Sequence, residues 1–164
     1  MTIRFGILTL SDRSARGERG DLSGSALARL VEGEGWVVVR RLILPDDETA
    51  IRETLAAWAD AGDLDIILTT GGSGFAPRDV TPEATRAVIE REAPGLAEAM
   101  RAESLKFTPH GMLSRSIAGI RKRTLIVNLP GSPKGAIENL QVILPVIPHA
   151  VQLLKEDPAS EKSH

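Results

Sequence analysis

Four short runs of the chain are rich in Ile, Leu and Val and show little alternation with polar residues. This pattern is typical of strands that are buried on both faces inside a parallel sheet. We therefore predict four buried strands, at Arg4–Leu10, Trp36–Leu44, Asp65–Thr70 and Thr124–Leu129.

Segments of helical period lie between these runs. Apolar residues recur there at spacings of three and four, which places them on one helix face. The alternation of strand and helix predicts an α/β fold, a three-layer α/β/α sandwich around a mostly parallel central sheet. From Lys106 to Arg123 we expect a long connection with one short helix, because Pro and Gly interrupt it. The helical stripes are Leu27–Leu30–Val31, Ile51–Leu55–Trp58, Ala84–Val88 (after Thr81), Leu96–Ala99–Met100 (within Pro94–Lys106) and Ile147–Val151–Leu154.

The length of 164 residues predicts one domain, which we place at residues 1–156, with a polar, frayed tail at 157–164. The first residues lack the pattern of a signal peptide. The longest apolar stretch, Val142–Leu154, contains two prolines, a histidine and a glutamine, so we expect no membrane span. Cysteine is absent, which excludes disulfides and thiolate chemistry and fits a cytoplasmic location.

The charge balance argues against nucleic acid as a partner. The formal net charge is −2 and the pI is about 5.9, whereas nucleic-acid binders usually carry a basic patch and a high pI. Three phenylalanines, two tryptophans and no tyrosine do not suggest a platform for stacking bases.

A glycine-rich loop follows the third predicted strand, and in open α/β sheets ligands bind beyond the carboxyl ends of the strands. The loop reads Thr70-Gly71-Gly72-Ser73-Gly74 and leads through Arg78 and Asp79 to Thr81-Pro82. Glycines allow backbone N–H groups to approach an anion, and Ser73 adds a hydroxyl. We expect Thr81 to cap a helix with Pro82 at its first position. The segment predicts an anion site.

Asp79 is chemically unusual beside such a loop, because a carboxylate repels phosphate unless a cation lies between them. Mg²⁺ is commonly held by one or two carboxylates together with substrate phosphates. The alternative is that Asp79 is a second helix cap, although Thr81 already suits that position. Arg78 either contacts phosphate or faces solvent, and the sequence favours neither.

The other strand ends carry weaker candidates. Pro45-Asp46-Asp47-Glu48 follows the second strand, and these acids either cap a helix or serve catalysis. Ser11-Asp12 and then Asp21-Leu22-Ser23 follow the first strand, where Asp21 or Ser23 can cap a helix and the loop can equally be a surface turn. After the fourth strand comes Pro130-Gly131-Ser132-Pro133-Lys134, with Ser132 as the expected cap and Ser132 and Lys134 as anion contacts.

Seven motifs in this order resemble one family, the molybdopterin adenylyltransferases of molybdenum-cofactor biosynthesis, which include the MogA-type enzymes and the G domains of gephyrin-like fusion proteins. The resemblance runs from Phe5 to about Lys155. Its carriers are Leu10-Ser11-Asp12, Asp21-Leu22-Ser23-Gly24, Leu44-Pro45-Asp46-Asp47-Glu48, Thr69-Thr70-Gly71-Gly72-Ser73-Gly74, Arg78-Asp79-Val80-Thr81-Pro82, Met112-Leu113-Ser114-Arg115 and Leu129-Pro130-Gly131-Ser132-Pro133.

The resemblance implies an enzyme that joins AMP from ATP to the terminal phosphate of molybdopterin and releases pyrophosphate, with Mg²⁺. It implies catalytic and metal-binding roles for Asp46 and Asp79. It further implies a homotrimer that contacts a molybdenum-insertion protein transiently. The alternatives are a non-catalytic molybdopterin-binding or scaffold module and an enzyme acting on another phosphorylated substrate. The implied ligand-binding residues are Ser11, Asp12, Asp21, Thr70, Gly71, Gly72, Ser73, Gly74, Ser114, Pro130, Gly131 and Ser132.

Overall fold

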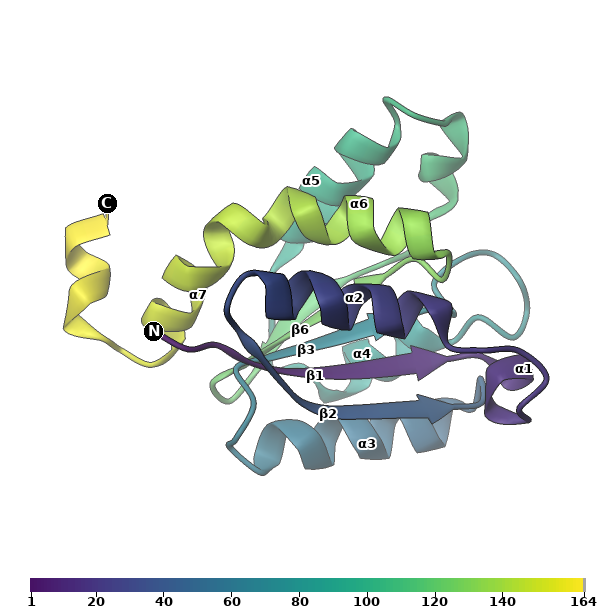
Figure 1. The fold of residues 1–164 in the computed structure, drawn as a ribbon, viewed down its shortest axis with the longest axis horizontal. Coiled ribbons are helices and arrows are strands. Elements are labelled where there is room, and N and C mark those ends of the chain that lie inside the picture. Colours follow the sequence, from purple (N-terminus) through teal and green to yellow (C-terminus); the bar gives the residue numbers. More distant parts are fainter. Residues whose placement is uncertain (164) are drawn as a thin grey trace.

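The computed structural model describes residues 1–163, which form a six-stranded sheet in the order β2-β1-β3-β6-β5-β4 (Figure 1). The first four strands in this order are parallel, and the last two are antiparallel to their neighbours. The sheet is thus mixed and mostly parallel, which confirms the predicted fold class. The bounds are β1 Arg4–Leu10, β2 Val37–Leu44, β3 Ile66–Thr70, β4 Arg91–Glu92, β5 Ala118–Arg121 and β6 Thr124–Leu129.

Helices cover both faces of the sheet (Figure 1). One face carries the larger apolar core, beneath α2 (Leu22–Gly33), α5 (Pro94–Ser104), α6 (Pro133–Ile143) and α7 (Ile147–Leu154). The other face carries a smaller core beneath α3 (Glu48–Asp60) and α4 (Thr81–Val88). The predicted helical stripes supply both cores, except that Ala99 is exposed, and Ala97 is the buried alanine of α5. The short elements are α1 (Asp12–Ala15), η1 (Pro109–Leu113), η2 (Leu144–Val146) and η3 (Pro158–Ser163).

Strand β2 lies at the edge of the sheet, and our expectation that it is buried on both faces is wrong. Its apolar side chains Val37, Val39, Leu42 and Ile43 are exposed. Hydrophobicity without alternation does not distinguish an edge strand from a central one. The burial of β1, β3 and β6 agrees with the pattern.

The segment from Lys106 to Arg123 holds more structure than the predicted connection with one short helix. It contains η1 and also strand β5, which pairs with the two-residue strand β4. Both strands are too short to give a period in the sequence. Gly119 permits the pairing, because a Cβ there would lie 2.5 Å from Ile89 Cδ1 and 2.9 Å from the Arg91 carbonyl oxygen.

The last helices form a longer apolar unit than the sequence suggested. By length and composition alone, the 22 residues of Pro133–Leu154, with mean hydropathy 1.3, are sufficient to cross a membrane. In the fold, Leu140, Ile143, Ile147 and Val151 of this unit lie in the larger core against the sheet. The helical run is therefore a core element of this domain.

The polar tail contains one short helical element, and its expected fraying stays a prediction. Residues Pro158–Ser163 form η3, and Asp157 starts it by accepting a hydrogen bond from the Ala159 N–H at 2.9 Å. A capped turn offsets part of the entropy that a polar tail loses on ordering. Residue 164, the last residue of the predicted tail, lies outside the described residues.

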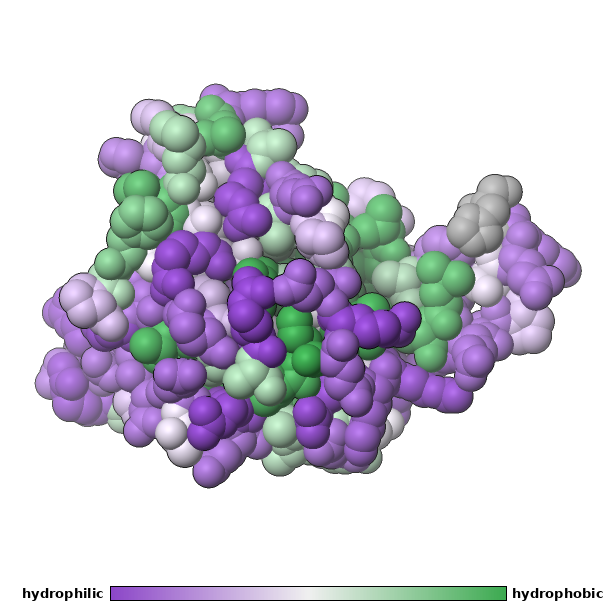
Figure 2. Space-filling view, turned by 180° about the vertical axis from the view of Figure 1, so that it is seen from behind, coloured by the Kyte–Doolittle hydropathy of each residue, from purple (hydrophilic) through white to green (hydrophobic). Residues whose placement is uncertain are grey.

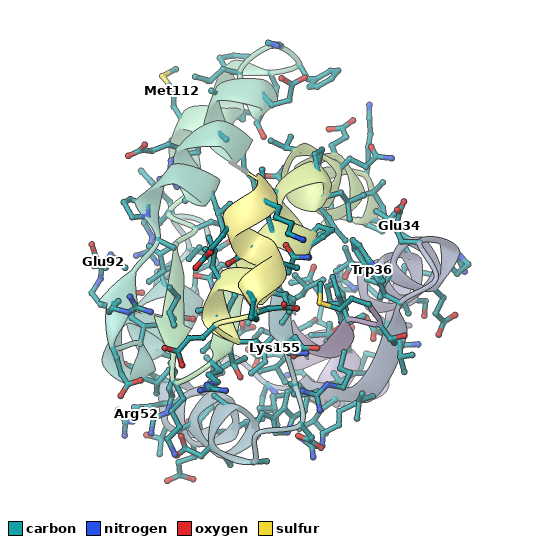
Figure 3. All side chains as sticks on the ribbon, turned by 90° about the vertical axis from the view of Figure 1, so that its left-hand side faces the viewer. Glu34, Trp36, Arg52, Glu92, Met112 and Lys155 are labelled. Atoms are coloured by element: carbon teal, nitrogen blue, oxygen red, sulfur yellow. The ribbon has the colours of Figure 1, made fainter. Side chains whose placement is uncertain are left out.

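A buried carboxylate secures the amino-terminal ends of the central strands. Asp65 accepts hydrogen bonds from the backbone and guanidinium of Arg4 at 2.8–3.2 Å, and Lys155 lies 3.2 Å from it. Figure 3 looks onto this end of the molecule, with Lys155 near the centre and Met112 projecting from the η1 corner. The anchor leaves the carboxyl ends of the strands, beside α1 in Figure 1, free for other roles.

Candidate functional site

Two cavities lie side by side at the carboxyl edge of the parallel strands, with volumes of about 700 and 570 Å³. Four residues line both cavities and form their common wall, namely Gly72, Asp79, Gly131 and Ser132. The first cavity also brings together Ser11, Asp12, Asp21, Asp46, Thr70 and Gly71 from the predicted set. The second also brings together Ser73, Gly74, Ser114 and Pro130. Each catalytic or ligand-binding residue implied by the family resemblance therefore lines at least one cavity.

The glycine loop approaches its neighbours more closely than any side chain would allow. Gly71 and Gly72 have φ values of +102° and +65°, in the region that favours glycine. A Cβ at Gly71 would lie 2.3 Å from the Leu10 carbonyl oxygen. A Cβ at Gly72 would lie 2.4 Å from Thr81 Oγ1 and 3.1 Å from Asp46 Oδ1. The loop therefore places main-chain atoms, without a side chain, at Gly72 in the wall between the cavities.

Thr81 holds this loop. Our prediction that Thr81 caps helix α4 is wrong. Helix α4 begins at Thr81 itself, and the residue before it is Val80, whose side chain cannot accept a hydrogen bond. The buried Thr81 hydroxyl donates to the Gly71 carbonyl at 3.0 Å, and its backbone N–H donates to the Gly72 carbonyl at 3.0 Å. The hydroxyl thus stabilises the glycine conformation rather than the helix end.

Asp46 is free for chemistry because Asp47 takes the cap of α3, accepting from the Ala50 N–H at 3.1 Å. The backbone N–H of Asp46 donates to Asp12 Oδ1 at 2.8 Å, and the N–H of Asp12 donates to Asp46 Oδ2 at 3.3 Å. Asp46 Oδ1 is buried and has no hydrogen-bond partner within residues 1–163. Burial, followed by the negative charges of Asp12 and Asp79, raises the pKa of Asp46.

Asp79 sits in the common wall with its side chain turned back on its own loop. Its Oδ2 accepts from the Ala76 N–H at 3.0 Å, and a Cβ at Gly74 would lie 3.1 Å from the same oxygen. The negative charge of Asp79 helps to raise the pKa of Asp46, and both carboxylates line the first cavity. The alternative role of Asp79 as a second helix cap fails, because it bonds to Ala76 ahead of α4.

Three further predicted residues are helix caps that also line cavities. Asp21 Oδ1 accepts from the Gly24 N–H at 2.9 Å, as predicted for the cap of α2, and from the Thr9 hydroxyl at 2.9 Å. Ser132 Oγ accepts from the Gly135 N–H at 3.1 Å, as predicted for α6. Ser11 Oγ accepts from the N–H of Ser14, at 3.2 Å. These contacts fix the walls of the cavities.

The site suits a cation only in part. No group of three His, Cys, Asp or Glu side chains with the arrangement of a metal cage occurs in the described part of the chain. The buried, unpartnered Oδ1 of Asp46 is nevertheless a ready ligand atom, and three further aspartates, Asp12, Asp21 and Asp79, line the same cavity. This donor set fits a hard divalent cation that completes its shell with ligand phosphates and water.

Sequence reasoning missed the outer walls of both cavities. Arg13, Arg16 and Arg19 join Arg78 around the first cavity, and an excess of arginine around α1 was the available signal. The predicted anion contact Lys134 lines neither cavity and lies 3.9 Å from Glu138.

The second cavity has an apolar outer wall of Phe75, Phe107 and Leu113, with His110 beside them. Seen from behind, hydrophobic residues gather at the corner formed by α5 and η1 (Figure 2). Phe75, Phe107 and Leu113 are 67%, 61% and 45% exposed, so this wall is open to solvent.

Comparison with known proteins supports a common architecture. Residues 6–149 match a family described as a probable molybdopterin binding domain. The chain is 41% identical to a molybdopterin adenylyltransferase of Helicobacter pylori (strain J99), over 93% of this chain and 88% of that protein. It superposes with a TM-score of 0.89 on the molybdopterin biosynthesis enzyme MoaB of Thermus thermophilus, at 52% identity, covering 96% of this chain and 99% of that one.

A third relative is much longer. The chain is 46% identical to the molybdenum cofactor synthesis protein cinnamon of Drosophila melanogaster over 95% of its own length, but it spans only 26% of that protein.

Proposed function

This chain belongs to the molybdopterin-binding family of molybdenum-cofactor biosynthesis, and on that premise we propose that it is a molybdopterin adenylyltransferase. The observation that carries the proposal is the wall shared by the two cavities. Two ligands that fill the cavities meet at Asp79, Gly72 and the turn at Gly131. Such a meeting point is what a transfer between two bound substrates requires.

The chemistry of each cavity supports a proposal for which ligand binds in it. The first is lined by acidic side chains at its base and by arginines at its rim, which suits the triphosphate of ATP. The second combines Phe75, Phe107 and Leu113 with the polar Ser114 and Asn139, which suits a flat heterocycle such as a pterin. The glycine loop then serves both ligands, Gly71 from the ATP side and Gly74 from the pterin side.

In the proposed reaction, an oxygen of the terminal phosphate of molybdopterin attacks the α-phosphorus of ATP. A new phosphorus–oxygen bond forms, the bond from the α-phosphorus to the α,β-bridging oxygen breaks, and the electron pair leaves with pyrophosphate. Transfer of this kind depends on positioning and on charge neutralisation. The backbone N–H groups of Gly72–Gly74 would orient the phosphates without adding negative charge, whereas the Gly71 N–H already donates to the Leu129 carbonyl at 3.2 Å. Arg78 lines the first cavity.

Asp46 and Asp79 are the residues that would hold Mg²⁺. The unpartnered Oδ1 of Asp46 and the raised pKa of this carboxyl both indicate a group that gains from a nearby cation. When bound, Mg²⁺ reduces repulsion between the carboxylates and the phosphates and stabilises the leaving pyrophosphate.

The direct experiment is incubation of the protein with molybdopterin, ATP and MgCl₂, with detection of pyrophosphate and of adenylylated molybdopterin. We expect both products in equal amounts. Asp79→Asn keeps the shape of the side chain and removes its charge, so we expect it to lose the transfer and to keep molybdopterin binding. Transfer by this variant at a rate near that of the wild type would contradict the role of Asp79.

A second candidate is a molybdopterin-binding module without transfer activity. The length of the Drosophila relative favours it, because a domain that spans about a quarter of a larger protein can hold a ligand for another part. Binding of molybdopterin in a thermal-shift titration, with no release of pyrophosphate from ATP, would identify this function.

We further propose that the protein acts in the cytoplasm as a homotrimer and passes its product to a molybdenum-insertion protein. The edge strand β2 supports self-association, because Val37, Val39, Leu42 and Ile43 are exposed along it. Exposed apolar edge strands usually pair or are covered.

A further inference from the structure

Arg115 holds the loop between the glycine motif and α4 at several points. Its Nε donates to the Gly74 carbonyl at 2.7 Å and its Nη2 donates to the Asp79 carbonyl at 2.8 Å. Nη1 and Nη2 bind the Glu83 carboxylate at 2.7 and 3.1 Å. The backbone N–H of Arg115 donates to the Ser73 carbonyl at 2.8 Å. One residue thus binds both ends of the segment 74–79.

The segment that Arg115 spans carries the carboxylate of the common wall. Asp79 ends it, and the Asp79 side chain is held only within the same segment, by the Ala76 N–H at 3.0 Å, among the hydrogen bonds of the described residues. Phe75 and Arg78 are exposed and give the segment little apolar anchoring. The two carbonyl contacts from Arg115 therefore set where this loop lies.

The position of Arg115 also connects this loop to the second cavity. Ser114, the residue before it, lines that cavity, while Asp79 lines both. Arg115 itself lines neither, so it acts on the site through other residues.

The planar guanidinium fork of Arg115 can contact Gly74, Asp79 and Glu83 at the same time because its N–H donors point in different directions. Its planar donors reach two carbonyl groups and a carboxylate in one geometry, whereas a lysine ammonium has a single nitrogen. The side chains of Arg115 and Glu83, which form the ion pair, are 34% and 48% exposed. Ion pairs between exposed side chains contribute little to stability. The contacts to the carbonyls and the contact to Glu83 are therefore separable by mutation.

We propose that Arg115 is a positioning residue that holds the Gly74–Asp79 loop so that Asp79 stays in the common wall of the two cavities, beside the proposed reacting phosphates. The inference rests on the proposed adenylyl transfer and adds a residue to it. Loss of the fork lets the loop shift, and a shift of about 1 Å at a reacting site lowers the rate about a hundredfold. Binding of either substrate depends on many other residues and changes far less.

The test compares Arg115→Lys with Glu83→Gln. Arg115→Lys keeps the charge and the stem but loses the fork, and we expect kcat to fall about 10- to 100-fold with KM for ATP within about threefold. Glu83→Gln weakens the ion pair and leaves both carbonyl contacts, so we expect kcat within about threefold of the wild type. Thermal unfolding of both variants shows that each is folded.

A second readout does not depend on turnover. Amide hydrogen exchange of the segment 74–81 should be faster in Arg115→Lys and unchanged in Glu83→Gln, with the rest of the chain unaltered in both. If the wild type transfers no AMP, the proposed function fails, and this exchange still tests whether Arg115 holds the loop.

The proposal is overturned if Arg115→Lys fails to change either kcat or exchange, or if Glu83→Gln has the same effect on activity. For Arg115→Lys, this means a kcat within about threefold of the wild type, or exchange in 74–81 that does not change. For Glu83→Gln, it means a loss of activity as large as in Arg115→Lys, which would assign the effect to the ion pair and not to the loop.

Discussion

Asp12 and Asp46 exchange backbone-to-carboxylate hydrogen bonds, at 2.8 Å from the Asp46 N–H and at 3.3 Å from the Asp12 N–H. The ends of β1 and β2 are thereby joined directly at the first cavity. Each aspartate positions the other, although their charges repel and help to raise the pKa of Asp46.

This reciprocal contact predicts that Asp12 acts by hydrogen bonding. Asp12→Ala removes the acceptor for the Asp46 N–H, and we expect it to lower the rate of adenylyl transfer at least tenfold by loosening Asp46. Asp12→Asn retains an oxygen acceptor at the same place and should retain most of the rate. Steady-state kinetics of the two variants decide the matter, and equal losses would show that the charge of Asp12 matters instead.

Asp46 is predicted to reduce stability in the absence of ligand. Asp46→Asn removes the charge of a carboxyl whose buried Oδ1 has no partner and whose pKa is raised, so we expect the free energy of unfolding at pH 7 to rise by about 0.5–1 kcal/mol while transfer is lost. In a chain of this size, each kcal/mol of added stability raises Tm by roughly 2–4 °C, so we expect Tm to rise. Asp47→Asn is the control, because asparagine caps a helix as well as aspartate does. A lower Tm for Asp46→Asn would refute the reasoning.

The Thr81 hydroxyl is predicted to stabilise the glycine loop. Thr81→Val keeps the shape of the side chain but leaves the Gly71 carbonyl without its 3.0 Å donor, which should cost about 1–3 kcal/mol. Thr81→Ser keeps the hydroxyl and should cost less. Urea unfolding measures both, and the idea fails if serine proves no better than valine.

Asp65 is predicted to give the protein acid sensitivity far from the site. Burial alone would raise its pKa, but hydrogen bonds from Arg4 and Lys155 lower it below the ordinary value. A lowered pKa in the folded state means that the stabilisation is complete above the unfolded value, about 3.9, and is lost as the pH falls below it. Asp65→Asn should cost about 3 kcal/mol at pH 7 and progressively less below pH 4.

The control for Asp65 is its neighbour Asp63, whose ion pair with Arg40 is partly exposed. Asp63→Asn should change the free energy of unfolding by less than about 1 kcal/mol. A cost for Asp65→Asn that stays constant between pH 7 and pH 2.5 would show that its charge is not what stabilises the fold.

The proposed trimer predicts that β2 tolerates no added charge. Val39→Lys places a charge on the exposed edge strand, and we expect monomers in light scattering after size exclusion. Val146→Lys introduces the same charge at an exposed site on η2 and should leave the assembly intact. A trimer that survives Val39→Lys would locate the contact elsewhere.

Much of the fold could be predicted because its elements are local. The predicted strands Arg4–Leu10 and Thr124–Leu129 have the observed bounds, since continuous apolar runs mark central parallel strands. The exposure of Val39 could not be predicted, because the place of a strand in the sheet depends on pairing between distant segments. The same holds for β4, whose two residues have no recurring pattern.

The inner part of the site was predictable because polar residues after strand ends converge at one edge. Asp46 and Asp79 both follow strands in this way. The sequence identifies Arg115 only as part of a family motif. Its role could not be predicted, because its contacts to Gly74 and Asp79 join residues more than thirty positions apart and have no local signature. Its importance becomes visible only when the carbonyl groups that it binds are placed in space.

The wall between the two cavities combines the main chain of Gly72 and Gly131 with the side chains of Asp79 and Ser132, whereas the outer walls consist of side chains from distant segments. The arginines near α1 and the aromatic residues near η1 line different cavities, and neither group belongs to the common wall. The side chains that would recognise each ligand are thus distinct from the common wall at which the proposed reaction would take place. A new specificity could therefore arise on either side by ordinary substitution while the meeting point of the two ligands stays the same.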